Sequence, residues 1–433
     1  MPQLTEPIAS TSITPGVRRY ALVVLAVVYM FNFVDRQIMA ILLPAIRDEF
    51  QVGDAVLGLL AGTAFALFYV TLGVPIGRLA DRVNRRNLIA AAVAIWSAMT
   101  ALSGLAANIW QLTLARVGVG IGEAGCSPPA HSMIADFYPP ERRSAAMGIY
   151  TVGISAGIML AYLGGGWVVQ NIGWREAFFI VGLPGLLLAL IVRFTIPEPQ
   201  RGVSEQRVDS GSQPSLSTVT KFLLARRSFL YMAIAGGLSS FVGYAVITFM
   251  PSFIYRSFGI GIAVVGIWLG LIYGIAGGCG FYFGGYLADR IGRGGHRKAM
   301  TFIALATIAC VPFFLGVFLS SSLVACMALL IIPSVISNFY LAPVLSHTQS
   351  LVSLRMRAVA SSLMLLILNV IGLAMGSPIT GLISDKLEPS YGPESMRYAL
   401  LIVSVVMLPI ASWCYFQAGK SIDQDLLRAN EHD

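Results

Sequence analysis

Two pairs of oppositely charged residues stand inside otherwise apolar stretches of the sequence. Asp35 and Arg36 interrupt the run around "NFVDRQIMA" (32–40), and Arg116 and Glu123 lie within "LTLARVGVGIGEAG" (112–125). An isolated charge at the centre of a membrane-spanning helix costs about 2.5–3.5 kcal/mol on insertion scales. Two acids and two bases can offset much of this by pairing. Ionisable groups at such depth normally face the interior of a helix bundle and mark a pathway.

The chemistry open to such a set is exchange of protons and ion-pair partners. A carboxylate that moves between a paired and an unpaired environment changes its affinity for protons. Protonation of Asp35 or Glu123 would free Arg36 or Arg116 to bind an anionic group. The alternative is a static ion-pair network that fixes helix packing, although buried pairs rarely stabilise a protein on balance.

The spacing of these residues predicts which charges meet. Asp35 and Arg116 each stand eight residues from the same end of their apolar runs, which places both about 12 Å below one surface at ~1.5 Å per residue. Glu123 lies about 10 Å deeper on nearly the same helical face as Arg116. We therefore expect Asp35 to pair with Arg116. Pairing of Arg36 with Glu123 would need helix tilt or a long reach.

Composition sets the class of protein in which these charges must be positioned. Of 433 residues, 56% are hydrophobic and 12% are charged, whereas soluble domains are closer to a quarter charged. Apolar runs of about 20 residues recur along the chain, as membrane-spanning helices require. Since unpaired backbone amides are too costly in lipid, we predict an all-α membrane protein.

Twelve spans are predicted, and the longest polar break divides them six and six. We expect a first six-helix bundle in residues 1–196, a cytoplasmic linker in 197–228, and a second six-helix bundle with a short cytoplasmic tail in 229–433. Within the linker, residues 215–227 are expected to form a short basic amphipathic helix on the membrane surface. The approximate limits of the spans are 20–44, 56–80, 88–107, 109–132, 144–170, 174–196, 229–255, 262–288, 299–319, 322–347, 357–384 and 396–418.

Lysine and arginine positions predict the orientation. With both termini in the cytoplasm, twenty of the 29 basic residues fall in cytoplasmic segments and five in outside loops, as the positive-inside rule requires. The net charge of +8 therefore reflects topology and not nucleic-acid binding. The short tails favour a bacterial inner (plasma) membrane, and we expect a monomer. No phosphate-binding loop, metal cluster or nucleophile arrangement is evident, so we expect neither an enzyme nor a cofactor other than the coupling proton.

A repeated motif links the two predicted halves. "GRLADRVNR" (77–85) ends the second span and "GYLADRIGR" (285–293) ends the eighth, 208 residues apart and identical at six of nine positions. Gly77 and Gly285 would let helices approach closely. Each aspartate needs a cationic partner near a helix C-terminus, and Arg85 and Arg293 stand four residues on, at helical-neighbour spacing.

The duplicated motif resembles the signature loop of the major facilitator superfamily, whose twelve-helix fold has two pseudo-symmetric six-helix bundles. The resemblance implies that this cluster latches the cytoplasmic ends of the halves when the transporter faces outward. A simpler alternative is that the charges only set topology. The gate residues implied are Asp81, Arg82, Arg85, Asp289 and Arg293.

The charged spans narrow the resemblance. N-x-x-D-R-x-x-x-A-x-x-L-P (32–44) and R-x-x-x-G-x-G-E-A (116–124) resemble the first and fourth helices of Spinster-type transporters. Known members move lysophospholipids or sphingosine-phosphate-like lipids. The resemblance implies proton coupling by Asp35 and Glu123, and binding of a substrate head group by Arg36, Arg116 and Asn32. Where the family often has proline, this chain has His131, with Pro128 and Pro129 earlier.

A second resemblance keeps another substrate class open. Glu123 followed five residues on by Pro128, together with the Asp35–Arg36 pair, is similar to the organic-anion/proton symporters of the same superfamily. The expected function is therefore proton-coupled transport by alternating access, of a lysolipid or of a small organic anion such as a sugar acid. A receptor or scramblase on the same scaffold is a further alternative.

The second half adds few charged residues to its spans. An asymmetric cavity would follow, ionisable on one side and apolar on the other, which suits an amphiphile with an anionic head and one tail. Such a cargo and the membrane lipids are the expected partners. The aromatic residues that could line the tail side, or could simply pack or face lipid, are Phe241, Tyr244, Phe249 and Phe253.

Overall fold

The structure is a computed structural model that describes residues 14–80, 82–200, 216–292, 295–353 and 356–430. Almost all of these residues are helical. In chain order the elements are α1 (Pro15–Phe50), α2 (Asp54–Gly58), η1 (Leu59–Thr63), α3 (Ala64–Ala80), α4 (Arg85–Ser103), α5 (Ile109–Glu123), α6 (Ser127–Phe137), α7 (Pro140–Asn171), α8 (Trp174–Thr195), α9 (Leu216–Leu224), α10 (Arg227–Phe258), α11 (Ile262–Leu271), η2 (Ile272–Ala276), α12 (Gly277–Gly292), α13 (His296–Leu319), α14 (Leu323–Ile336), α15 (Leu341–Ser350), α16 (Arg357–Asn369), η4 (Val370–Ala374), α17 (Met375–Tyr391), η5 (Gly392–Glu394) and α18 (Ser395–Asn430).

Ten helical stretches in the described part of the chain are long and apolar enough to cross a membrane. This number is smaller than the predicted twelve for two reasons. The stretch Val359–Leu427 includes both α16–α17 and most of α18, and a break after Glu123 leaves α5 and α6 individually too short. The all-helical membrane fold is nevertheless the one that the apolar runs predict.

Helix boundaries follow local sequence signals. Side chains of Asn84 and Asn108 accept hydrogen bonds from the backbone N–H groups of Asn87 (2.9 Å) and Gln111 (3.0 Å), which caps α4 and α5 at their N-termini. Gly259 ends α10 in the left-handed conformation (φ 62°), which glycine adopts without steric cost. These three helix ends are therefore fixed by local sequence.

Five of the predicted spans are not regular α-helices. The fourth is broken between α5 and α6, where Pro128 and Pro129 prevent the helix from continuing past Glu123. The tenth is broken between α14 and α15. The second, eighth and eleventh each contain a π-helical turn (η1, η2 and η4), a feature often found at functional sites. The apolar runs alone do not reveal these interruptions.

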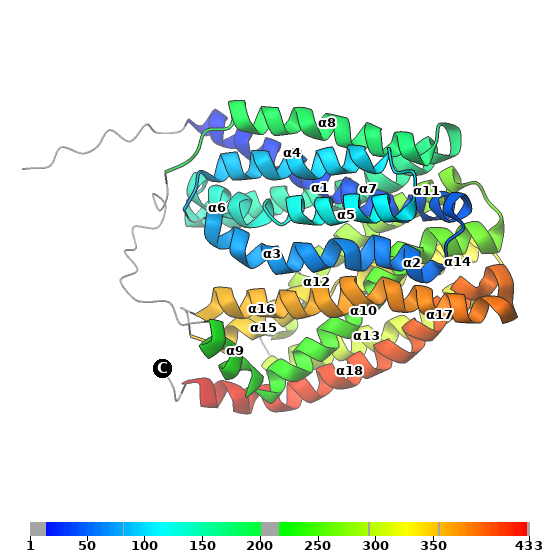
Figure 1. Ribbon diagram of the computed structural model, residues 1–433. Helices are drawn as coiled ribbons and strands as arrows, with labels where there is room; N and C mark the ends of the chain where they lie inside the picture. Colours follow the sequence, from blue (N-terminus) through cyan, green and yellow to red (C-terminus); the bar gives the residue numbers. More distant parts are fainter. Residues whose placement is uncertain (1–13, 81, 201–215, 293–294, 354–355, 431–433) are drawn as a thin grey trace, which may run out of the picture.

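The chain forms two groups of helices, which we call the N-terminal half (α1–α8) and the C-terminal half (α10–α18) (Figure 1). The start of α1 and the end of α18 lie at one end of the bundle, which we call the terminal end; we call the opposite end the far end. Of the amphipathic helix predicted for 215–227, the structure has the shorter α9, with Val219 and Leu223 buried and Lys221 exposed, and residue 227 already begins α10.

The last helix, α18, is hydrogen-bonded to α10, the first helix of the C-terminal half. Asp425, near the end of α18, is buried and accepts hydrogen bonds from the backbone N–H (2.8 Å) and the hydroxyl (2.7 Å) of Ser228. Ser228 lies in the first turn of α10, where unpaired N–H groups favour an acidic partner. The end of the chain thus anchors the helix that begins the C-terminal half.

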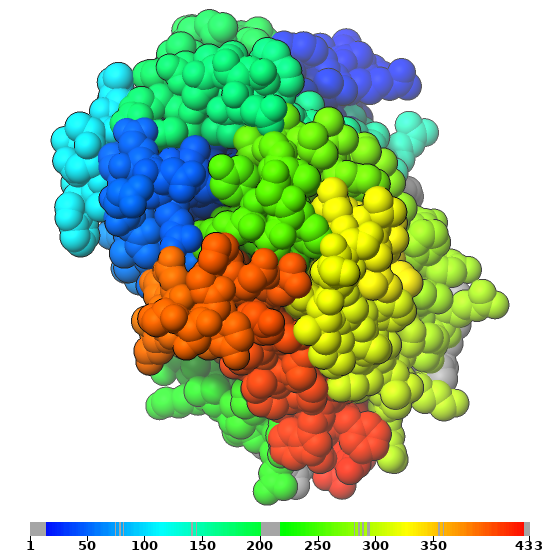
Figure 2. Space-filling view, turned by 90° about the vertical axis from the view of Figure 1, so that its right-hand side faces the viewer, coloured from blue at the N-terminus to red at the C-terminus, as the bar shows by residue number. Residues whose placement is uncertain are grey.

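Two pseudo-symmetric seams join the halves at the far end, which Figure 2 shows facing the viewer. In one, α2 packs on α17; in the other, α11 packs on α7. A Cβ at Gly58 would meet the Ser377 carbonyl oxygen, and one at Gly266 would meet the Tyr162 carbonyl oxygen. The partner helices carry matching glycines. A Cβ at Gly381 would meet the Asp54 carbonyl oxygen, and one at Gly166 would meet the Ile262 carbonyl oxygen. Glycine thus permits close backbone approach in both seams.

Packing at the terminal end of the second span is different. A Cβ built at Gly77 would meet no neighbouring atom within 4 Å among the described residues. The expected close approach of another helix at Gly77 is therefore absent in this conformation. Contacts between the halves close the far end at these two seams, whereas the bundle has open space at Gly77.

Candidate functional site

The first of the two predicted ion pairs forms as expected. Arg116 Nη1 of α5 lies 3.2 Å from Asp35 Oδ1 of α1, and both side chains are buried. The Thr100 hydroxyl of α4 donates a hydrogen bond to the other carboxylate oxygen of Asp35. Three helices of the N-terminal half thus converge on one carboxylate, and Thr100 is a partner that sequence spacing did not reveal.

The second pair forms directly. Arg36 donates from Nη2 (2.6 Å) and from Nε (3.2 Å) to Glu123 Oε2. The spacing predicts that this pair needs helix tilt or a long reach, and the Arg36 side chain makes such a reach. Glu123 is the last residue of α5, directly before the break, and the long arginine side chain reaches it there.

Aromatic rings surround Arg36. Its Cζ atom lies 4.8 Å from the ring centroids of Phe65 and Tyr69 and 5.1 Å from that of Phe33. The Asn32 side-chain oxygen is 3.5 Å from Nη2, and Tyr244 of α10 also interacts with the guanidinium group. Because Tyr244 belongs to the C-terminal half, the charged cluster lies at the boundary between the halves.

The cluster is electrically balanced but not fully hydrogen-bonded. Two acids face two bases, and the Arg36 side chain is 11% exposed while that of Glu123 is fully buried. Among the described residues, Arg116 Nε and Nη2 have no hydrogen-bond partner. Buried donors without partners are costly, so an additional anionic group or a rearranged carboxylate would be stabilised beside Arg116. The arrangement can therefore exchange partners.

The four aromatic residues predicted to line a tail-binding side divide into two groups. Phe249 and Phe253 are fully buried in the main apolar core, where Phe253 contacts the rings of Phe258 and Phe318. Phe241 is also buried in that core, and its carbonyl oxygen lies close to Gly376 of α17. Of the four, Tyr244 is partly exposed and neighbours Arg36.

The structure describes part of the predicted gate. Asp81 and Arg293 lie outside the described residues, Asp289 lies within α12, and Arg82 is exposed in the turn after α3. The predicted spacing of Asp81 and Arg85 cannot be compared with the structure beyond the position of Arg85, which is the first residue of α4.

Arg85 is buried and binds groups within its own half. It forms ion pairs with Asp136 of α6 and, at 2.8 Å, with Glu198, which follows α8. Its guanidinium also donates to the Ser132 hydroxyl and to the Pro199 carbonyl oxygen, each at 2.8 Å. Arg85 therefore ties the start of α4 to α6 and to the segment that leaves the N-terminal half.

A second charged network, which sequence reasoning missed, crosses the halves at the far end. The Asp54 carboxylate is buried and accepts two hydrogen bonds from Arg256 of α10, at 2.7 and 2.6 Å, and one from the Ser384 hydroxyl at 2.7 Å. The Asp385 carboxylate in turn accepts hydrogen bonds from the backbone N–H groups of Asp54 (2.6 Å) and Ala55 (2.9 Å). We call the α2–α17 contact the charged seam.

The equivalent contact on the other side of the far end lacks these charges. Ile262 stands where Asp54 does, and the backbone N–H of Ala263 donates to the Gln170 side-chain oxygen at 2.9 Å. We call the α7–α11 contact the neutral seam. A repeat could have signalled both seams: "FQVGDAVLG" (50–58) and "FGIGIAVVG" (258–266) share Phe, Gly, Ala, Val and Gly at the same 208-residue separation as the gate motif.

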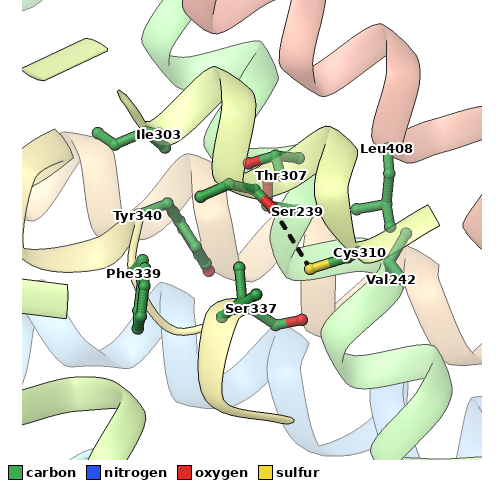
Figure 3. A pocket seen from close by; sticks show the side chains of 11 residues that line it. Ser239, Val242, Ile303, Thr307, Cys310, Ser337, Phe339, Tyr340 and Leu408 are labelled. Atoms are coloured by element: carbon green, nitrogen blue, oxygen red, sulfur yellow. Dashed lines mark hydrogen bonds between the residues drawn. The ribbon is translucent and has the colours of Figure 1, made fainter. Parts of the chain in front are cut away.

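Two cavities lie away from the charged cluster. The one in Figure 3, between Ser239, Thr307, Cys310 and Tyr340, has a volume of about 10 Å³, which is close to the space that one water needs. A larger one of about 230 Å³ opens at the far end beside Arg47, Tyr255 and Glu388. Within the described ranges, no group of three or more His, Cys, Asp or Glu side chains is placed to hold a metal ion.

Comparison with known proteins places this geometry in a family. The model of the Major Facilitator Superfamily matches residues 25–377. An "MFS-type efflux pump" of Mycolicibacterium smegmatis is 32% identical over 408 residues, which cover 93% of each chain. "Protein spinster homolog 1" of Mus musculus is 28% identical over 454 residues, covering 98% of this chain and 84% of the relative.

Solved structures agree with the sequence comparisons. A bacterial homolog of the human lysosomal transporter Spinster, in an inward-facing and unoccupied conformation, superposes with a TM-score of 0.84 at 31% identity, covering 95% of this chain and 99% of that chain. The occupied inward-facing form of such a homolog gives a TM-score of 0.83 at 30% identity. The helical membrane fold, the two halves and these matches together mean that this chain belongs to the major facilitator superfamily, as a Spinster-like membrane transporter and not an enzyme.

Proposed function

We propose that this transporter is proton-coupled and moves an amphiphile with an anionic head group, such as a lysolipid or a sphingosine-phosphate-like lipid, by alternating access. The observation that carries the proposal is the buried cluster of Arg36–Glu123 and Arg116–Asp35 at the boundary between the halves. Two ion pairs in this position cost desolvation energy that packing alone does not require.

Proton coupling follows from the exchange of partners that the cluster permits. Protonation of Glu123 would leave Arg36 with its aromatic neighbours and Asn32, ready to bind an anionic head group. Arg116, with two unpartnered nitrogens among the described residues, could then attract the remaining carboxylate. Proton uptake and substrate binding would thus compete for, or cooperate through, the same guanidinium groups.

The amphiphilic substrate class is supported by the surroundings of Arg36. The four charges all belong to the N-terminal half, and the amphipathic side chain of Tyr244 approaches Arg36 from the C-terminal half. The rings of Phe33, Phe65 and Tyr69 give the binding region a mixed polar and apolar character. A head group on Arg36 and Asn32, with a tail directed along the C-terminal half, fits this asymmetry.

The closed far end and the space at Gly77 support a conformation open towards the terminal end. The excess of lysine and arginine in segments at that end supports a cytoplasmic location for both termini, in a bacterial inner membrane. The structure would then represent the inward-facing state. In the outward-facing state, Asp81, Arg82, Arg85, Asp289 and Arg293 would form the cytoplasmic latch.

Uptake into proteoliposomes tests the proposal. A labelled lysolipid and a labelled sugar acid are offered to vesicles containing the protein, with and without an imposed pH gradient. We expect lysolipid accumulation that depends on the gradient, and loss of gradient-driven uptake in Asp35→Asn and Glu123→Gln. Glu49→Gln is the matched control: it removes a carboxylate of α1 that binds Trp174 and Arg175 outside the cluster, and should keep uptake.

Each alternative gives a distinct result. Sugar-acid uptake without lysolipid uptake would replace the substrate class by small organic anions. Lipid movement that never exceeds equilibration under a pH gradient would indicate a scramblase, and binding without movement a receptor. Full gradient-driven uptake in either cluster variant would remove that carboxylate from the coupling mechanism.

A further inference from the structure

One aromatic ring contacts both arginines of the buried cluster. Phe65 is the second residue of α3 and has no exposed surface. Its ring centroid lies 4.8 Å from Cζ of Arg36 and 5.7 Å from Cζ of Arg116. Phe33 and Tyr69, by contrast, have described cation–π contacts with Arg36 alone. Among the described residues, Phe65 therefore has the ring with cation–π contacts to the arginines of both ion pairs.

The backbone at Phe65 is held against the helix that carries two of the charges. A Cβ built at Gly120 would meet the Phe65 carbonyl oxygen, so α3 and α5 touch at this point. Gly120 lies one helical turn after Arg116 and one turn before Glu123. The Phe65 ring also stacks on Tyr69, with centroids 5.3 Å apart and an interplanar angle of 19°. Any displacement of this part of α3 must therefore change the contacts of the ring with the charged cluster.

The residues just before Phe65 contact the other half. The Thr63 hydroxyl, at the end of the π-helical turn η1, donates a 2.6 Å hydrogen bond to the Ala374 carbonyl oxygen at the end of η4. A Cβ at Gly62 would lie 2.6 Å from the Leu373 carbonyl oxygen. Two π-helical turns, one from each half, thus meet two residues away from Phe65. Separation of the halves here must break the Thr63 bond and free η1 to change its backbone conformation.

We propose that Phe65 is a positioning residue that couples the contact between η1 and η4 to both buried ion pairs. The proposal rests on the proton coupling proposed above and assigns the part that transmits it. With the halves in contact, the ring lies where it stabilises both guanidinium groups. When the halves part at η1, the ring moves relative to Arg36 and Arg116, and the carboxylates become the better partners.

The sign of the effect on proton binding follows from which state the ring favours. A desolvated cation–π contact stabilises an arginine most when its carboxylate is protonated and no longer neutralises it. Removal of the ring therefore favours the ion pairs and opposes protonation. Besides the four charged members of the cluster, the described titratable groups that face it are Tyr29, Tyr69, Cys126 and Tyr244. These groups are unchanged in the variants below, so they do not contribute to the difference.

The test is the pH at which gradient-driven uptake is half-maximal. We expect Phe65→Leu to move this midpoint to lower pH by about one unit, since a desolvated cation–π contact is worth on the order of tenfold in an equilibrium. Phe33→Leu, which removes a ring next to Arg36 alone, should move it less. Phe65→Tyr keeps the ring and should retain the wild-type midpoint. A shift in Phe65→Leu without a shift in Phe65→Tyr would show that the midpoint depends on the aromatic ring.

The link to the other half has its own test. Thr63→Val removes the hydroxyl that binds Ala374 and keeps the side-chain shape. It should shift the midpoint in the presence of Phe65 and add nothing in the Phe65→Leu background. A wild-type midpoint in Phe65→Leu, a shift no larger than that of Phe33→Leu, or full additivity with Thr63→Val would overturn the inference alone. Wild-type uptake that ignores the pH gradient would overturn the proposed function and this inference together.

Discussion

The two seams at the far end share a backbone architecture and differ in their side chains. In the charged seam, glycines of α2 and α17 let each helix come close to a backbone carbonyl oxygen of the other. Glycines of α11 and α7 do the same in the neutral seam. In each seam, one side chain accepts a hydrogen bond from the start of α2 or α11: Asp385 in the charged seam and Gln170 in the neutral seam. The charged seam alone adds the buried pair of Asp54 and Arg256.

The difference shows how one closed end can combine two kinds of contact. When a seam opens, the free energy gained by burying its apolar groups is lost in full, because water does not stabilise the apolar groups that become exposed. Buried charges behave differently, since water solvates them again once they are exposed. Asp54 and Arg256 therefore specify the closed arrangement without making it much more stable than the open one. A transporter that alternates between two states needs such a balance.

Breaking the charge balance of the charged seam should have the largest effect. Asp54→Asn leaves Arg256 buried without its carboxylate, which costs about 3–5 kcal/mol in the closed state and little in the hydrated open state. We expect the far end to open. The measurement is labelling of Ser252→Cys, at a buried position of α10, by a membrane-impermeant maleimide, with the exposed Cys279 replaced by serine.

The double variant is the control for this change. Adding Arg256→Gln to Asp54→Asn removes the unpaired cation and should restore much of the protection of residue 252. Unchanged labelling in Asp54→Asn would mean that the charged pair does not influence closure.

The shared backbone contacts should give a smaller and equal effect in both seams. Gly58→Ala and Gly266→Ala each place a methyl group against a carbonyl oxygen of the other half, and overpacking of this kind costs about 1–3 kcal/mol. Labelling of Ser252→Cys should rise to a similar extent in the two variants. Gly164→Ala is the matched control, because its Cβ would meet nothing within 4 Å. A strong effect at one glycine and none at the other would show that the seams do not open together.

Substitution of the side chains that cap the helix starts should have the smallest effect, and this effect should differ between the two seams. Asp385→Ala and Gln170→Ala each leave N–H groups at a helix start without an acceptor, which costs roughly 0.5–2 kcal/mol. The loss should be larger for Asp385, because it accepts two hydrogen bonds and an anion is favoured at a helix N-terminus. Thermal unfolding in detergent, compared with Gly164→Ala, would measure the order. Equal losses would mean that the charge of Asp385 adds nothing beyond hydrogen bonding.

Much of the fold could be predicted from apolar runs, because lipid leaves a spanning chain little choice but helix. Asp35 and Arg116 could be paired from depth alone, since both stand the same distance from one surface. The pairing of Arg36 with Glu123 could not, because it depends on the break after Glu123 and on how helices tilt. No spacing rule would identify Asp385 as a partner of Asp54, which is 331 residues away. The 208-residue repeat around Asp54 was the available signal.

The buried Asp425 has a practical consequence for anyone who expresses this protein. Its carboxylate holds Ser228 at the start of α10, and α10 carries both Tyr244 beside the cluster and Arg256 in the charged seam. A chain shortened before residue 425 would loosen the helix that contributes both to the surroundings of the cluster and to the charged seam. Affinity tags or fluorescent reporters should therefore be joined after the last turn of α18.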